Sequence, residues 1–152
     1  MQLQECAKAV VVLSGHPGLK TEEEKTARRK IDDQWSKKLE TIPLDVFIEE
    51  WYQQPIFQTL NTILKRRFTQ NPQDLAKVMR QLSLANQPHF TQFTKPTLFL
   101  HGEEDLKYQQ LYNTLPKTVS VRSIKNCGHV IPIENAKESA ETILHWLNNA
   151  NS

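Results

Sequence analysis

Residues 96–129 read PTLFLHGEEDLKYQQLYNTLPKTVSVRSIKNCGH, and this stretch is the strongest indication of the fold. An apolar, strand-forming run at 97–101 is followed by a helical segment at 106–115 and by a second strand at 119–124. Asp105 comes just after the first strand, and His129 comes just after the second. Strands that alternate with helices form a parallel sheet, and ligands bind at the carboxyl edge of such a sheet. We therefore expect Asp105 and His129 to form a pair at that edge.

This pair has the chemistry of a general base. A carboxylate bound to one imidazole nitrogen holds the ring in one tautomer, so that the other nitrogen can accept a proton. Gly128 lets the backbone turn sharply just before His129. Glu103 and Glu104 are rivals of Asp105, but the Gly-x-x-Asp spacing after the strand favours Asp105. A histidine here without an acid partner would more often be structural.

The chain contains no nucleophile that would complete a catalytic triad. None of its serines lies in a G-x-S-x-G motif, and Ser14 follows a strand in the unrelated context Leu-Ser-Gly-His. Cys127 is too close in sequence to His129 to form a separate Cys/His pair, and a small buried thiol is the simpler interpretation. His101 has no second histidine or carboxylate at ligand spacing, so we expect no metal site.

The rest of the chain divides by its hydrophobic pattern. Val10-Val11-Val12-Leu13 predicts a strand that is buried on both faces, as in a parallel sheet. Amphipathic helices are expected at 20–40, 43–51, 57–68, from 72 onward and at 134–148. The predicted fold class is therefore α/β, with parallel strands, flanking helices and a helical insertion. Residues 1–19 and 87–152 would form a partial core, and residues 20–86 a helical cap.

The composition excludes several classes of partner. The net charge of +2 over 152 residues gives no reason to expect nucleic acid or an acidic membrane surface. The basic run at 65–67 reads as a solvated helix face. Two cysteines do not make a disulfide scaffold, and no apolar run approaches the ~20 residues that a membrane span needs. We expect a cytoplasmic protein without a signal peptide.

Four further stretches extend the pattern over nearly the whole chain. They are Gly15-His16-Pro17-Gly18-Leu19, Asp33-Gln34-Trp35, Trp51-Tyr52-Gln53-Gln54-Pro55-Ile56-Phe57 and Ser83-Leu84-Ala85-x-Gln87-Pro88. Together with the Gly-x-x-Asp and Cys-Gly-His elements, they resemble one branch of the α/β-hydrolases, the 2-succinyl-6-hydroxy-2,4-cyclohexadiene-1-carboxylate synthases of menaquinone biosynthesis. The resemblance covers only the carboxyl-terminal part of that family's length.

The resemblance implies a function and a site. The family eliminates pyruvate from 2-succinyl-5-enolpyruvyl-6-hydroxy-3-cyclohexene-1-carboxylate, with a triad serine as the proton-abstracting group and without cofactor or metal. Asp105 matches the triad acid and His129 the triad histidine. The residues that match substrate-binding positions are the cap arginines Arg28 and Arg67, which would bind the carboxylates of this small-molecule substrate, and the pocket aromatics Trp51 and Tyr52.

The chain departs from the family in what it lacks. The G-x-S-x-G elbow, the His-Gly oxyanion loop and an arginine that follows the elbow are absent from the sequence. The expectation is therefore a truncated gene product, a mis-assigned start or one half of a split gene, and a chain that is inactive by itself. In the split-gene case its partner would be a separate amino-terminal half. Two alternatives stay open. One is a different α/β-hydrolase, an esterase or thioesterase, which would have no use for two cap arginines. The other is a non-catalytic remnant that needs a partner chain.

Overall fold

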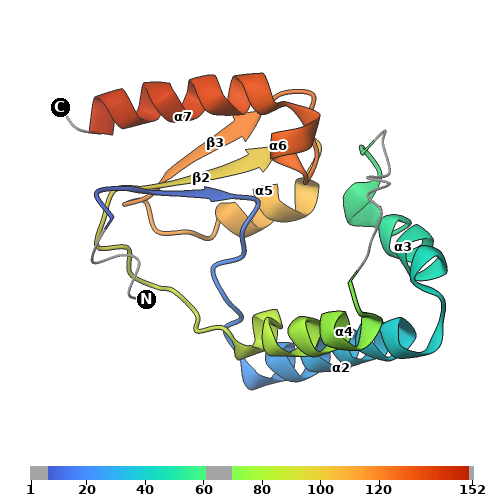
Figure 1. Ribbon diagram of the computed structural model, residues 1–152. Coiled ribbons are helices and arrows are strands. Elements are labelled where there is room, and N and C mark those ends of the chain that lie inside the picture. The colour runs from blue at the N-terminus through green and yellow to red at the C-terminus, as the bar shows by residue number, and fades with distance from the viewer. Residues whose placement is uncertain (1–6, 61–69, 151–152) are drawn as a thin grey trace. The chain divides into compact units, whose positions relative to one another are not determined.

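A parallel sheet organises the first of the two units into which the chain divides (Figure 1). The computed structural model describes residues 7–60 and 70–150. The first unit, here called the sheet unit, comprises Met1–Gly15, Pro55–Asn61 and Thr91–Ser152. The second, the helical unit, comprises His16–Gln54 and Thr62–Phe90.

The sheet has three strands in the order β1-β2-β3, and both pairings are parallel. β1 spans Val10–Leu13, β2 spans Thr97–Gly102 and β3 spans Ser120–Ile124. In the register, Val12 pairs with Phe99, and Phe99 pairs with Val121. Every residue of the central strand β2 is buried. These strands confirm the predicted α/β class, because unbroken apolar runs form strands that are covered on both faces.

Alternate residues of β2 supply two cores, one on each face of the sheet. Leu98 and Leu100 pack with Ile124, Cys127 and Ile131, against Ile143 and Trp146 of α7. Phe99 points to the opposite face and packs with Tyr108 and Tyr112 of α5. Figure 1 accordingly shows α7 (Ala136–Ala150) and α5 (Leu106–Tyr112) on opposite sides of the sheet.

The carboxyl-terminal helix is broken, where the sequence predicted one continuous helix over 134–148. A short helix, α6, spans Ile131–Glu134, and α7 begins at Ala136. Asn135 separates them with an extended φ of -150°, and its side-chain oxygen accepts a hydrogen bond from the Glu138 N–H at 3.3 Å. Asn135 therefore ends one helix and caps the next, as short polar side chains commonly do.

The helical unit is built on two long helices that lie side by side (Figure 1). α2 spans Glu22–Thr41 and α4 spans Pro72–Gln81, while α3 (Leu44–Tyr52) and the 3-10 turn η2 (Leu84–Asn86) complete the unit. Thr21 and Glu24 form a capping box at the start of α2. Leu39, Phe47 and Ala76 are the buried centre of this unit, with Trp35 and Trp51 packed against them.

The segment after α3 belongs to the sheet unit. A 3-10 turn, η1 (Pro55–Phe57), places Ile56 against the Phe99 core. The sequence predicted a helix over 57–68, but the described part of that range, residues 57–60, is the end of η1 and a turn. The remainder of the predicted helix lies outside the described residues. The assignment of 20–86 as a functional cap stays a prediction.

None of the helices in the described parts of the chain is both long and apolar enough to cross a membrane. The cytoplasmic location stays a prediction.

Candidate active site

The loops that follow β2 and β3 touch each other through their backbones. A Cβ atom on Gly102 would overlap the carbonyl oxygens of Cys127 and Gly128, so only glycine fits at this position. The Glu103 N–H donates to the Ile124 carbonyl at 2.8 Å, and the Glu104 N–H donates to the Cys127 carbonyl at 3.0 Å. This close contact brings the residues that follow each strand to the same place.

Asp105 meets His129 at this place, as the sequence predicted. The distance between Asp105 Oδ2 and His129 Nδ1 is 2.7 Å. The other carboxylate oxygen, Oδ1, accepts the Tyr108 N–H at 3.2 Å and thereby caps helix α5. The Asp105 side chain is only 5% exposed, and the two glutamates before it are turned to other partners or to solvent. Of the three acids, the structure selects Asp105.

The His129 ring is oriented for base chemistry. A carboxylate can only accept, so Nδ1 carries the proton in this pair and Nε2 presents its lone pair. Among the described residues, Nε2 has no hydrogen-bond partner. One side of the imidazole lies against the Tyr108 ring, with 4.8 Å between the ring centroids. The side chain is 21% exposed, so a substrate can reach it.

Glu134 is a member of this site that the sequence analysis missed. Its carboxylate accepts the N–H groups of Gly128 at 2.8 Å and of Val130 at 2.7 Å, the two residues that flank His129. A carboxylate five positions after a Gly-His dipeptide was the available signal. This spacing predicts no contact by itself, because the contact requires residues 128–134 to form a closed turn.

Two groups near the pair have pKa values raised by burial. Burial raises the pKa of the Cys127 thiol to about 11, and the negative charge of Glu134 adds to the shift. Cys127 is fully buried, in agreement with its interpretation as a small buried thiol. Burial also raises the pKa of Tyr112, whose hydroxyl donates to the Gly15 carbonyl at 2.9 Å. Both groups stay protonated at neutral pH.

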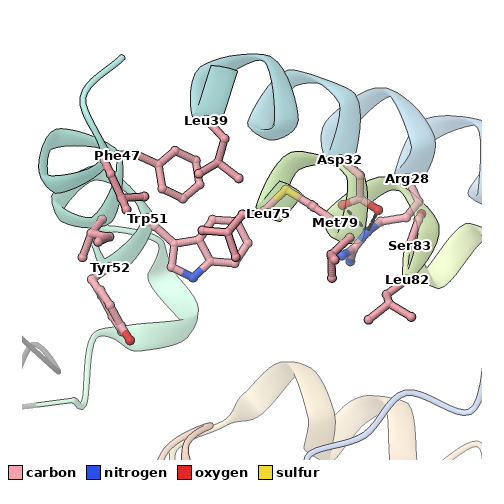
Figure 2. Close-up of a pocket in the computed structure, with 13 residues that line it drawn as sticks. Arg28, Asp32, Leu39, Phe47, Trp51, Tyr52, Leu75, Met79, Leu82 and Ser83 are labelled. Carbon is pink, nitrogen blue, oxygen red and sulfur yellow. Dashed lines mark hydrogen bonds and ion pairs between the residues drawn. The ribbon is translucent and has the colours of Figure 1, made fainter. Parts of the chain in front are cut away.

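The helical unit contains a pocket of about 410 Å³ with mostly apolar walls. Figure 2 shows the aromatic side chains of Trp51 and Tyr52 toward one end and the Arg28 guanidinium at the other. Three of the four residues expected to bind substrate therefore line one pocket. Arg67, the fourth, lies outside the described residues.

Asp32 anchors the arginine of this pocket. Nε of Arg28 donates to both carboxylate oxygens of Asp32, each at 2.9 Å, across one turn of α2. The Asp32 side chain is 8% exposed and that of Arg28 is 40% exposed. Within the described residues, the two terminal nitrogens of Arg28 make no hydrogen bond. They are the atoms that bind carboxylates in a bidentate fashion.

No three His, Cys, Asp or Glu side chains in the described ranges are grouped so that they could hold a metal ion. The expectation that the protein uses neither metal nor cofactor stays a prediction.

Comparison with known proteins gives the family. The 2-succinyl-6-hydroxy-2,4-cyclohexadiene-1-carboxylate synthases of Citrobacter koseri and Escherichia coli are each 36% identical to this chain over 135 residues, which cover 83% of the chain and 53% of the relative. The structure of MenH from S. aureus matches with a TM-score of 0.84 at 28% identity, over 95% of this chain and 60% of that protein. This chain belongs to the MenH-type α/β-hydrolases.

The match to this family is partial in length. The chain spans about half the length of the curated relatives it matches, and this includes the synthase of Salmonella heidelberg at 34% identity. A putative hydrolase from Bacillus subtilis shares the fold, with a TM-score of 0.50 at 20% identity over 96% of this chain and 53% of that protein. No family model matches the chain.

Proposed function

We propose that this chain supplies the acid–histidine pair and the carboxylate-binding pocket of a menaquinone-pathway synthase. The reaction is elimination of pyruvate from 2-succinyl-5-enolpyruvyl-6-hydroxy-3-cyclohexene-1-carboxylate. The observation that carries the proposal is the 2.7 Å contact between Asp105 and His129 at the carboxyl edge of the sheet. The relatives named as synthases for the same product support it.

His129 acts as the proton acceptor that makes a serine basic. Asp105 keeps the proton on Nδ1, so Nε2 can take the proton of a serine hydroxyl. The serine oxygen then removes a proton from a carbon of the substrate ring. The released electron pair forms a double bond between ring carbons 2 and 3, the existing double bond shifts from carbons 3 and 4 to carbons 4 and 5, and the bond between carbon 5 and the enolpyruvyl oxygen breaks. Enolpyruvate takes up a proton and leaves as pyruvate.

Arg28 gives the helical unit its selectivity in this proposal. Its terminal nitrogens bind a substrate carboxylate, while Asp32 holds the guanidinium from the Nε side. Trp51 and Tyr52 cover the apolar part of the substrate in the same pocket. Arg67 binds a second carboxylate. Asp32 pairs with Nε only, and an esterase for apolar acyl groups would have no use for the two terminal nitrogens of Arg28, so the pocket favours an acidic substrate.

No G-x-S-x-G motif occurs in the 152 residues, and the proposal assigns the serine to a segment outside them. The partner is an amino-terminal half that carries the elbow and the oxyanion-binding N–H groups. By itself the chain is expected to be inactive.

The test is a coupled assay of pyruvate release from the pathway substrate. It compares this chain alone, the amino-terminal half of a related synthase alone, and the mixture. We expect release only in the mixture and its loss with His129→Ala. His145→Ala removes an exposed histidine on α7 and should leave the rate unchanged. Release by the chain alone would contradict the requirement for a partner. A folded mixture that releases no pyruvate, or that hydrolyses simple esters instead, would contradict the proposed function.

A further inference from the structure

A single carboxylate holds the backbone on both sides of His129. Glu134 Oε2 accepts the Gly128 N–H at 2.8 Å, and Oε1 accepts the Val130 N–H at 2.7 Å. The two oxygens therefore bind the peptide group that follows the histidine and the peptide group that joins Cys127 to Gly128. Glu134 is partly buried, and the interactions that fix its side chain are both with this loop.

We propose that Glu134 is a positioning residue that holds His129 against Asp105. The inference rests on the proposed function in one respect, that His129 is the proton acceptor. The direction of the imidazole depends on the orientation of the two peptide planes that flank its Cα atom. Glu134 binds the N–H of the plane that follows this Cα atom, and it also binds the N–H of Gly128, the residue at which the preceding plane begins. It thereby restricts the plane after the histidine directly and the plane before it through Gly128, and so limits where the ring can reach.

The backbone of His129 has no regular secondary structure to orient it, so the hydrogen bonds from Glu134 are needed. His129 lies outside regular helix and strand, so no helical or ladder hydrogen bond orients it. Glu134 itself is well anchored, because its own N–H donates to the Val130 carbonyl at 3.0 Å and Ile131 of the same helix is fully buried. Residues 128–134 thus close into a ring of backbone and side-chain hydrogen bonds that rests on the core.

The negative charge of Glu134 strengthens its two hydrogen bonds to the loop. Hydrogen bonds to a carboxylate are about twice as strong as neutral ones. Glutamine has the same shape but only one acceptor oxygen, and its amide nitrogen would face one of the two N–H groups as a second donor. Glu134→Gln can therefore keep one of the two hydrogen bonds, whereas Glu134→Ala loses both.

The experiment has to distinguish an effect on the imidazole through the loop backbone from an effect through direct contact with the ring. Asp105 binds Nδ1, and the Tyr108 ring covers one side of the imidazole. Glu134 makes its hydrogen bonds to the backbone of the loop. A change in the ring that follows loss of Glu134 must therefore pass through the position of the backbone, and not through a lost contact with the ring itself.

The test uses the whole 152-residue chain labelled with ¹⁵N, at a pH where imidazole groups are neutral. The ring-nitrogen shifts of His129, assigned by their absence in His129→Ala, report which nitrogen carries the proton. Hydrogen exchange reports the Gly128 and Val130 amides. Glu141→Gln is the matched control, because it removes an exposed carboxylate on α7 that makes no contact with the loop.

With Glu134 present we expect the Nδ1–H form. In Glu134→Ala the ring should become a mixture of both tautomers, and both amides should exchange about tenfold faster or more, because each loses a charge-assisted bond. In Glu134→Gln only one amide should lose its protection. Glu141→Gln should match the unsubstituted chain.

The proposal is overturned if Glu134→Ala keeps the Nδ1–H form and slow exchange at both amides. If Glu134→Ala does not fold by circular dichroism, Glu134→Gln decides, because protection of both amides in that variant contradicts the proposal. These readouts need no activity. Failure of the mixed chains to release pyruvate would overturn the proposed function and leave this inference standing. In an active mixture, Glu134→Ala should lower kcat and leave KM unchanged.

Discussion

At the scale of the residue, Cys127 shows how position controls reactivity. It lies two residues before His129, yet its side chain is fully buried in the core beneath α7. Burial and the charge of Glu134 raise its pKa to about 11. The thiolate is the reactive form, so a raised pKa means an unreactive thiol at neutral pH.

We predict that Cys127 reacts slowly with iodoacetamide in the folded chain. At pH 8 a thiol with a pKa of about 11 is ionised in about one molecule in a thousand. Labelling of the Cys127 peptide, followed by mass spectrometry, should be about a hundredfold slower than in the urea-unfolded chain. The same shift should lower the free energy of unfolding as the pH rises from about 9 toward 11, because only the unfolded chain releases the proton there. Equal labelling rates in both states would contradict this account.

At the scale of the element, the start of α2 can be read from the sequence alone. The Thr21 hydroxyl accepts the Glu24 N–H at 3.1 Å, and the Glu24 carboxylate accepts the Thr21 N–H at 3.0 Å. Both bonds lie within four consecutive residues, so they need no tertiary contact. The same helix carries Arg28 and Asp32, so the residue at which it begins determines in which helical turns these two side chains lie.

Thr21→Ala should lower the free energy of unfolding by about 1 kcal/mol, because it leaves N-terminal N–H groups of α2 without an acceptor. Urea unfolding followed by circular dichroism measures the change. Thr26→Ala is the control, since Thr26 is exposed in the interior of the same helix and alanine is the better helix former. If the two variants lose stability equally, the cap has no special role.

At the scale of the whole molecule, each unit depends on its own aromatic cluster. In the sheet unit, the Phe99 ring makes edge contacts with Phe93 at 5.5 Å and with Tyr112 at 5.0 Å between centroids. In the helical unit, Trp35 contacts Phe47 and Trp51 at 5.7 and 5.1 Å. Such rings contribute their buried area and an additional favourable edge interaction.

Phe99→Ala should destabilise the sheet unit by about 3–5 kcal/mol, because it leaves a cavity in a close-packed core. Phe99 is 2% exposed, whereas Leu144 on α7 is 61% exposed. Leu144→Ala should change the free energy of unfolding by less than about 0.5 kcal/mol. Urea denaturation of the two variants gives both values. A similar cost for both would mean that burial in this core does not govern stability.

Much of the fold follows from local pattern. The strands at 10–13, 97–101 and 119–124 lie within one residue of β1, β2 and β3, because a short apolar run between turn residues has few other conformations. The break at Asn135 was missed, because the residues on both sides favour helix and only the cap geometry separates α6 from α7.

The sequence alone is enough to predict the three strands, the capping of α2, the absence of a G-x-S-x-G motif from the 152 residues and the pairing of Asp105 with His129. Each of these depends on neighbouring residues or on the rule that parallel strands end at one edge. Three features become visible only in the folded chain: Glu134 binds the His129 loop, Asp32 anchors Arg28 beside a pocket, and Ile56 packs in the core of the sheet unit. A carboxylate at the surface and one that binds two backbone N–H groups of a loop look the same in a sequence. The backbone groups that distinguish them are brought together only by folding.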